Sequence, residues 1–142
     1  MSVVFDTEAL LAFYLGEDDG EEVMKILTDV QEGKVRGYLN IVNLSELYYI
    51  LYRKSPMMAE EKERSLRGFG LEIVPLIDDQ LWKEAAIIKG KRALSLADAF
   101  AAATVKVYKA KLLTLRDEEF SGLEIPLIRI GKQRSSNKSK AL

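Results

Sequence analysis

Hydrophobic positions along the chain alternate between short runs and longer stretches that repeat every three or four residues. The short runs are rich in β-branched, leucine and aromatic residues, which is typical of buried strands. They lie at residues 2–5, 37–42, 71–77, 111–115 and 126–130. We therefore predict five strands, the third of which is closed by Pro75.

The stretches between these runs carry the spacing of helices, with one buried face in most of them and apolar residues on nearly all sides at residues 43–54. They lie at residues 7–15, 21–33, 43–54, 57–70, 78–93 and 95–108, and an acidic turn at residues 116–120 precedes the last strand. Strands that alternate with helices in this order predict an α/β sandwich with a mainly parallel sheet.

The length of 142 residues predicts one domain, because a chain of this size buries enough apolar surface without disulfides or a structural metal. We expect this domain to occupy residues 1–131. Residues 132–142 contain basic side chains, no acid and no periodicity, which indicates a basic, disordered tail. Contact of this tail with RNA is the alternative.

Composition limits the chemistry that the chain can carry. It contains no Cys and no His, so disulfides, zinc clusters, thiolate nucleophiles and imidazole bases are excluded. Lys and Arg number 21 against 22 Asp and Glu, which argues against a generally basic nucleic-acid coat. No apolar run reaches the roughly 18 residues of a membrane span. We expect a cytoplasmic protein that does not bind membranes.

Acidic residues follow several of the predicted strands. Asp6 comes directly after the first strand, and Asp117 follows the fourth by two residues. Glu46 and Asp98 lie in the first turns of two predicted helices. Because strand-to-helix loops of a parallel sheet gather at its carboxyl edge, all four acids can lie at one edge.

Helix capping is the alternative explanation for two of these acids. Asn43 with Glu46, and Ser95 with Asp98, both have the spacing of a capping box, in which the acid bonds back to the first residue of the helix. However, Glu46 and Asp98 are each the only acidic or basic side chain of an apolar run. A cap on a solvated helix end needs no such surroundings, which favours a functional role.

Carboxylates that converge in a partly dry site repel one another unless a cation neutralises them. With oxygen ligands alone, Mg²⁺ or Mn²⁺ is the metal that fits best. Such an ion activates water and stabilises charge on a phosphate. This chemistry needs no His base, so it agrees with the composition.

Four segments carry a resemblance to a known family. They are the strand ending in Asp6, NLSELYYIL around Glu46, SLADAFAAAT around Asp98 and LLTLRDEEF around Asp117. Together they resemble the PIN domain family, and the VapC toxins of bacterial and archaeal type II toxin-antitoxin pairs are the most similar subgroup in length. The resemblance covers residues 1 to about 130, and SLADAFAAAT is its most specific part.

The resemblance implies a three-layer α/β/α fold and cleavage of single-stranded RNA with Mg²⁺ or Mn²⁺. The acids that match the family's catalytic and metal-binding positions are Asp6, Glu46 and Asp98, with Asp117 as the fourth. Two threonines support them: Thr7 stands next to Asp6, and Thr114 would orient a metal-binding acid through a hydrogen bond.

The segment around the fourth acid departs from the family pattern. The family commonly shows Thr or Ser, one residue, then Asp, with an aromatic residue three further on. Here two residues separate Thr114 from Asp117, although Asp117 and Phe120 keep the second spacing. Glu118 and Glu119 are therefore rivals for the fourth position, and a solvated turn is the alternative for both.

RNA binding without sequence readout depends on contacts to phosphates. The basic residues that we expect to contribute are Arg116, Arg53, Lys54 and Arg92. Arg116 is the best placed because it precedes Asp117, whereas a solvated helix end is the favoured explanation for the others. Tyr48, Tyr49 and Tyr52 could stack on a base, but their apolar helix favours core packing or a dimer surface.

The resemblance also implies partners. VapC-like proteins are usually homodimers, and a cognate antitoxin inserts a peptide segment, often with a basic residue, into the acidic pocket. Three other functions remain open: a non-enzymatic module that binds RNA or protein, a housekeeping RNA-processing nuclease, and a phosphotransfer enzyme with Asp6 as nucleophile. The last is disfavoured because Asp6-Thr7-Glu8 lacks the second Asp that such phosphatases show.

Overall fold

Within the residues that the structure describes, five short strands form one sheet in which every neighbouring pair is parallel. The structure is a computed structural model that describes residues 1–130. The strands are β1 (Ser2–Phe5), β2 (Arg36–Asn40), β3 (Glu72–Val74), β4 (Lys111–Thr114) and β5 (Leu127–Arg129). Their order in the sheet is β3-β2-β1-β4-β5. The predicted α/β fold with a mainly parallel sheet is confirmed.

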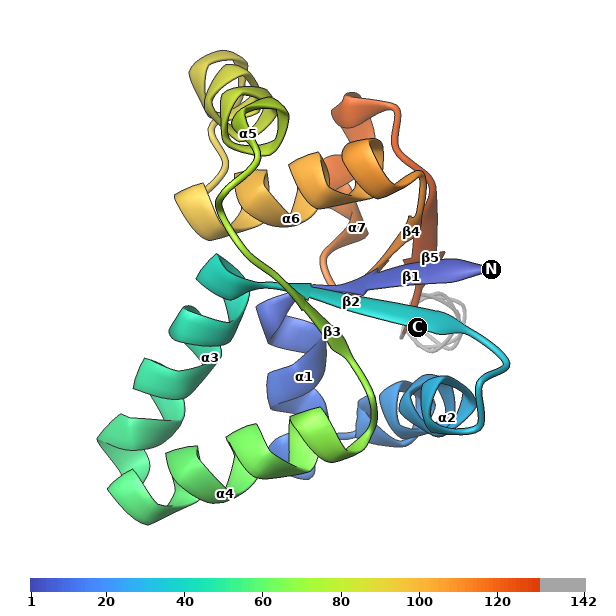
Figure 1. Cartoon of the computed structure of the whole chain (residues 1–142), viewed down its shortest axis with the longest axis vertical. Helices are drawn as coiled ribbons and strands as arrows, with labels where there is room; N and C mark the ends of the chain where they lie inside the picture. Colours follow the sequence, from blue (N-terminus) through green and yellow to red (C-terminus); the bar gives the residue numbers. More distant parts are fainter. Residues whose placement is uncertain (131–142) are drawn as a thin grey trace, which may run out of the picture.

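Helices cover both faces of this sheet (Figure 1). They are α1 (Thr7–Tyr14), α2 (Gly20–Gln31), α3 (Ile41–Lys54), α4 (Pro56–Gly68), α5 (Asp79–Lys91), α6 (Leu96–Tyr108) and α7 (Asp117–Phe120), with a 3₁₀ turn at Ser121–Leu123. In Figure 1, α1 to α4 lie on one side of the sheet and α5 to α7 on the other. This arrangement is the expected three-layer α/β/α sandwich.

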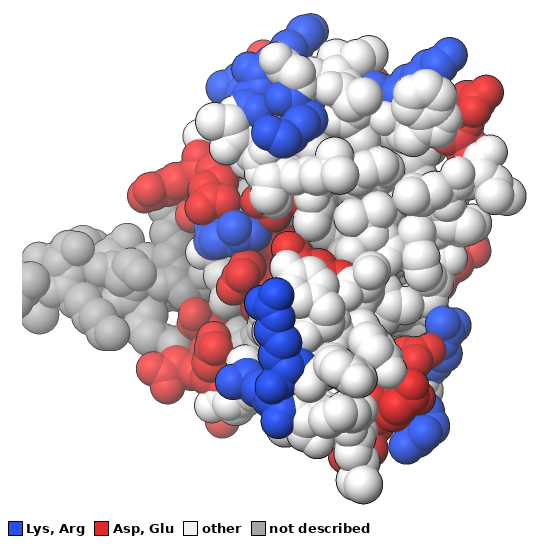
Figure 2. Space-filling model, turned by 90° about the vertical axis from the view of Figure 1, so that its left-hand side faces the viewer, with Lys and Arg blue, Asp and Glu red and all other residues white. Residues whose placement is uncertain are grey.

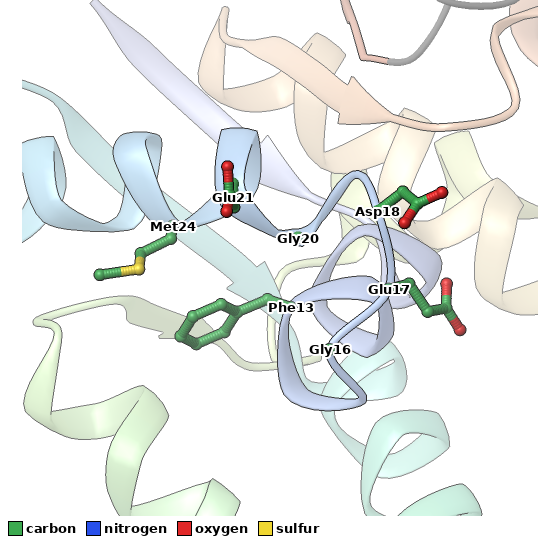
Figure 3. Close-up of a pocket in the computed structure, with 7 residues that line it drawn as sticks. All are labelled: Phe13, Gly16, Glu17, Asp18, Gly20, Glu21 and Met24. Atoms are coloured by element: carbon green, nitrogen blue, oxygen red, sulfur yellow. The ribbon is translucent and has the colours of Figure 1, made fainter.

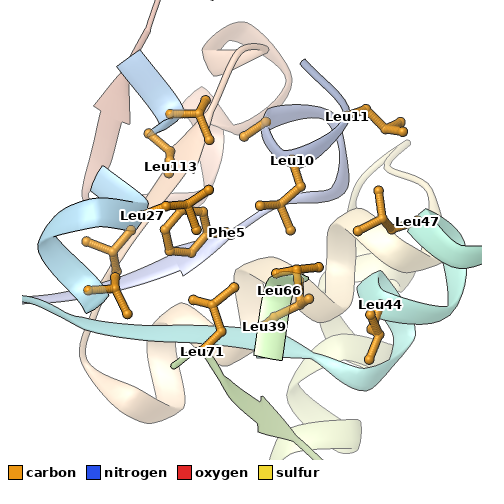
Figure 4. Close-up of a cluster of buried hydrophobic side chains, with 14 of the residues drawn as sticks. Phe5, Leu10, Leu11, Leu27, Leu39, Leu44, Leu47, Leu66, Leu71 and Leu113 are labelled. Atoms are coloured by element: carbon orange, nitrogen blue, oxygen red, sulfur yellow. The ribbon is translucent and has the colours of Figure 1, made fainter. Parts of the chain in front are cut away.

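Alternate residues of the central strands supply two separate hydrophobic cores. In β1, Val3 and Phe5 pack with α1 to α4, whereas Val4 packs with α5 and α6. In β4, Leu113 belongs to the first of these cores and Leu112 to the second. Figure 4 shows Phe5 among the leucines of the first core. The two-residue period of a strand therefore explains why both faces of the sheet must be covered.

The strand order creates a switch point at the carboxyl ends of β1 and β4. The chain leaves β1 to form β2 on one side, and later returns to form β4 on the other side. Phe5 pairs with Leu113 in register, and the amide of Asp6 donates to the Leu113 carbonyl at 3.3 Å. Such a switch point is where open α/β sheets bind ligands. Asp6 and Thr114 both lie there.

The start of α3 differs from the prediction. The second strand ends at Asn40, and Ile41 and Val42 belong to the helix instead of the strand. The side chain of Asn40 caps this helix by accepting from the Val42 amide at 2.8 Å. The proposed capping box of Asn43 and Glu46 is therefore wrong, because Asn43 lies inside the helix.

The other predicted cap is correct. Ser95 precedes α6, and its hydroxyl accepts from the Asp98 amide at 3.1 Å. The predicted acidic turn contains the short helix α7. The predicted tail at residues 132–142 lies outside the described residues, and the domain boundary stays a prediction. Within residues 1–130, no helix combines the length and the apolar character that crossing a membrane requires.

We predict that Gly20→Ala lowers the free energy of unfolding by roughly 2 kcal/mol, because overpacked positions force backbone shifts. A Cβ atom at Gly20 would lie 2.7 Å from the Ala12 carbonyl oxygen, and backbone cannot move aside as a side chain can. Urea denaturation followed by circular dichroism measures the change.

Gly90→Ala is the matched control. Gly90 lies inside α5 with nothing within 4 Å of the added Cβ, so we expect stabilisation by about 0.5–1 kcal/mol from helix propensity. Equal stabilities of the Gly20→Ala variant and the unaltered chain would contradict the close approach of α1 and α2.

Candidate active site

Asp6 is a fully buried carboxylate at the end of the central strand. It is the N-cap of α1, and its Oδ1 accepts from the Ala9 amide at 2.8 Å. Its Oδ2 is buried and, within residues 1–130, has no hydrogen-bond partner at normal distance and angle. Oδ1 thus caps the helix, while the hydrogen-bonding capacity of Oδ2 is unused. A buried acceptor of this kind is rare and destabilising unless a ligand completes it.

The surroundings of Asp6 change its protonation. Burial raises the pKa of this carboxyl from 3.8 to about 6. The Ala9 amide, the nearby Thr114 hydroxyl and the Arg116 guanidinium lower the pKa, whereas the negative charge of Asp98 raises it. Desolvation is the largest of these effects, as expected for a charge removed from water without a full set of partners.

Asp98 lies in the first turn of α6 and is only 5% exposed. Its carboxylate does not form the reciprocal half of the capping box, because its Oδ1 accepts from Arg116 Nη2 at 2.8 Å. Ser95 alone supplies the cap through its hydroxyl. The carboxylate of Asp98 therefore faces the ends of β1 and β4 rather than its own helix.

Asn43 connects the starts of three helices at this edge of the sheet. Its Nδ2 donates to the Ala97 carbonyl of α6 at 3.1 Å, and its own carbonyl accepts from the Thr7 hydroxyl of α1 at 3.3 Å. Asn43 is fully buried, and its Oδ1 has no hydrogen-bond partner among the described residues. The sequence predicts only a capping role for Asn43. The missed signal is a second amide, three residues after Asn40, within an apolar helix.

Thr114 and Arg116 approach the two acids from the end of β4. The Thr114 hydroxyl accepts from the Arg116 amide at 3.0 Å, which fixes the turn that leads into α7. The Arg116 guanidinium donates to Asp98 and, through Nη1, to Glu119 at 3.0 Å. Burial lowers the pKa of Arg116, but the three acids near it raise it above its ordinary value.

The two remaining predicted acids have other surroundings. Glu46 is half-buried on α3, and within residues 1–130 no hydrogen-bond or ion-pair partner contacts it. Asp117 forms an ion pair with Arg129, with 3.4 Å between Oδ2 and Nε. In the described part of the chain, no three acidic side chains converge as the ligands of one ion. The structure brings Asp6 and Asp98 together, and the roles of Glu46 and Asp117 stay predictions.

The other predicted RNA-binding residues lie on the surface. Arg53 stacks over the exposed Tyr49 ring at 5.0 Å, and Lys54 is exposed at the end of α3. Arg92 donates to the Gly122 carbonyl. Core packing is wrong for Tyr49 and Tyr52, which are 46% and 53% exposed.

Charge is unevenly distributed over the carboxyl edge of the sheet. Figure 2 shows this face, with acidic side chains gathered at mid-height around a basic one, and further basic side chains above and below them. A phosphate backbone would find its basic contacts at the margins of the face, while a cation would be attracted to the middle.

The donor set at this edge fits a hard divalent ion. It offers two carboxylates, Asp6 and Asp98, with one unsatisfied oxygen on Asp6. Mg²⁺ typically binds through one or two carboxylates and keeps several waters. Arg116 already places one positive charge beside these two acids.

A family profile described as PIN domain matches residues 3–125. This chain belongs to the PIN domain family. The comparison with curated proteins gives no match.

Solved structures share the fold of this PIN domain. A chain of VapBC2 from Rickettsia felis, bound to a promoter DNA fragment, has a TM-score of 0.73 at 15% identity and covers 92% of this chain and 99% of that chain. A chain of a toxin-antitoxin complex from Klebsiella pneumoniae has a TM-score of 0.70 at 15% identity, and the match covers 89% of this chain and 95% of that chain. A chain of FitAcB from Neisseria gonorrhoeae has a TM-score of 0.67 at 22% identity, and the match covers 89% of this chain and 96% of that chain.

A separate surface hollow lies between the end of α1 and the start of α2 (Figure 3). Phe13 and Met24 lie on one side of it, and Glu17 and Asp18 point away from them. These acids are exposed, and neither Asp6 nor Asp98 lines the hollow. We assign no chemistry of this PIN domain to it.

We predict that Asp6→Asn stabilises the folded chain at pH 7 by up to about 3 kcal/mol, the equivalent of its pKa shift. The folded-state pKa lies above the ordinary value of 3.8, so the folded chain holds this proton more tightly than the unfolded chain. The contribution of Asp6 to stability is therefore greatest below pH 3.8 and falls as the pH rises to about 6.

Urea denaturation at pH 7 and below pH 4 tests this expectation. The stabilisation by Asp6→Asn should disappear at the lower pH, and the exposed Asp18→Asn serves as the control for removal of an acid. A loss of stability at pH 7 in Asp6→Asn would contradict the cost of burial that we assign to this carboxylate.

Proposed function

We propose that this PIN domain is an endoribonuclease of the VapC type, which hydrolyses phosphodiester bonds of single-stranded RNA with Mg²⁺ or Mn²⁺. The observation that carries the proposal is the pairing of Asp6 and Asp98 at the switch point of the sheet, with one buried oxygen of Asp6 left without a partner. Family membership makes nuclease chemistry the natural use of such a pair.

Each residue has a defined task in this proposal. Asp6 and Asp98 would hold the ion, which when bound supplies positive charge that polarises a phosphate and the attacking water. Thr114 restrains Asp6 from the neighbouring strand, and Asn43 keeps the starts of α1, α3 and α6 at fixed positions. We expect Glu46 and Asp117 to complete the acidic set.

Proton transfer must fall to carboxylates or water. In hydrolysis, water adds to phosphorus, the bond to the leaving oxygen breaks, and that oxygen takes up a proton. The chain has no His or Cys, so this proposal assigns the role of side-chain base near neutral pH to a carboxylate. Exposed cations such as Arg53, Lys54 and Arg92 would hold the RNA phosphates beside the site.

The partners in this proposal are a cognate antitoxin and a second copy of the chain, acting in the cytoplasm where the RNA is found. Support for the antitoxin comes from the similar structures, which include VapBC2 and FitAcB. Their low identity makes this an argument from fold alone. For the homodimer, the exposed rings of Tyr49 and Tyr52 offer an apolar surface on α3.

One observation favours a second candidate, a PIN-like module that binds RNA or protein without catalysis. Within residues 1–130, no three acids gather as ligands of one ion. A module of this kind would bind its partner equally well with and without a divalent ion.

We predict that Asp98→Asn lowers kcat/KM for a fluorogenic single-stranded RNA by at least about 100-fold, because a metal ligand and a transition-state contact are lost together. Cleavage is measured with Mn²⁺ present and after its removal by a chelator. The matched control is Glu61→Gln, an exposed acid of α4, which should retain full activity. Full activity in Asp98→Asn, or cleavage that survives the chelator, would exclude the proposed mechanism.

The identity of the fourth acid has its own test. We predict that Asp117→Asn lowers kcat/KM by at least about tenfold, because Asp117 keeps the spacing to Phe120 and is partly shielded, as a carboxylate near the reaction should be. Glu118→Gln, in the same helix, should change it less than about twofold, because Glu118 is exposed. A larger loss in Glu118→Gln would move the fourth position to Glu118.

A further inference from the structure

The Arg116 guanidinium lies between two elements of the acidic site. Its Nη2 is 2.8 Å from Asp98 Oδ1 on α6, and its Nη1 is 3.0 Å from Glu119 Oε2 on α7. Its Nε is buried and has no hydrogen-bond partner in the described part of the chain. Arg116 therefore contacts the acids of the site through two of its three nitrogens.

Local structure holds Arg116 in this position. The Thr114 hydroxyl accepts from the Arg116 amide, so residue 116 is tied to the end of β4. By the family pattern, the second residue after Thr114 would be an acid, whereas here it is Arg116, and the acid follows at Asp117. The extra residue thus places a positive charge where a negative one is expected.

This charge satisfies one of the two buried acids and leaves the other incomplete. Asp98 forms an ion pair with the guanidinium. Asp6 interacts with Arg116 only through its charge, and within residues 1–130 its Oδ2 has no hydrogen-bond partner. A divalent ion that took Asp98 as a ligand would stand beside the guanidinium, and like charges at such short range repel strongly. The two cations therefore compete for Asp98.

Arg116 also has room to leave. Its side chain is 32% exposed, and its second partner, Glu119, is 48% exposed. Ion pairs at such an exposure are weak and exchange readily with water. If the guanidinium moves towards solvent, the only strong interaction that it loses is therefore the ion pair with Asp98.

We propose that Arg116 is a built-in counter-cation, which holds Asp98 in the metal-free protein and must release it before a divalent ion can bind. This inference rests on the proposed function, because it concerns the same metal site. It implies that the chain lowers its own metal affinity.

Isothermal titration of the full chain with Mn²⁺, without RNA, tests the competition. Arg116→Gln should bind Mn²⁺ at least about tenfold more tightly than the unaltered protein, because the competing charge is gone. Arg116→Lys, which keeps a cation, should stay within about threefold of it. The control is Arg67→Gln on α4, which removes an equal charge from an exposed pair with Glu63 and should leave the affinity unchanged.

A second measurement uses the unaltered protein and so does not depend on the folding of a variant. Phenylglyoxal modifies exposed guanidinium groups, and mass spectrometry locates the adducts. Saturating Mn²⁺ should increase modification of Arg116 at least about threefold, since a released guanidinium is more accessible. Modification of Arg67 should not change.

The outcomes separate this inference from the proposed function. Equal or weaker Mn²⁺ binding by Arg116→Gln, or unchanged modification of Arg116, would overturn the counter-cation role even if RNA cleavage is normal. A purely structural role would destabilise Arg116→Gln without tightening Mn²⁺ binding. Failure of the unaltered protein and of Arg116→Gln to bind Mn²⁺ would overturn both proposals.

Discussion

The burial of the Asp6 carboxylate is the constraint on which this structure depends. A charge at the end of the central strand is costly in a hydrophobic interior. The chain reduces that cost with the Ala9 amide at the start of α1, the Thr114 hydroxyl at the end of β4 and the positive charge of Arg116. These groups come from α1 and from the end of β4, so the pairing of β1 with β4 is what accommodates Asp6.

Asn43 meets a related requirement for the helices. Three helix starts converge at the carboxyl edge, and each brings backbone groups that need partners. A single buried amide contacts Thr7 of α1 and Ala97 of α6 from within α3. The cost is one unpartnered oxygen on Asn43 itself. Polar contacts between buried elements fix one geometry more strictly than apolar packing alone.

The electrostatics of the edge follow from one extra residue after Thr114. Arg116 stands between the acids of α6 and α7, so the carboxylates do not face each other uncompensated. This arrangement explains how two buried or nearly buried acids coexist in the metal-free protein. It also makes the affinity of the site for cations a property of the loop between β4 and α7, and not of the acids alone.

Much of the fold could be predicted because its signals are local. The two-residue period of the strands and the longer period of the helices are set by neighbouring residues, and they predicted the α/β sandwich. The predicted start of α3 at residue 43 lies two residues after the observed start at Ile41. The sequence could not decide between them, because either Asn40 or Asn43 can cap a helix. For Tyr49 and Tyr52 the apolar pattern of α3 left core packing and a dimer surface open, and only their exposure excludes the core.

By itself, the sequence determined that acids follow the strands and that no His or Cys takes part in the chemistry, because residue types and local spacing are enough for both conclusions. Tertiary structure alone decided that Asp6 and Asp98 become neighbours, that Asn43 joins three helices, and that Arg116 turns towards Asp98. These contacts connect elements far apart in the chain, and their energies depend on burial that no local pattern specifies.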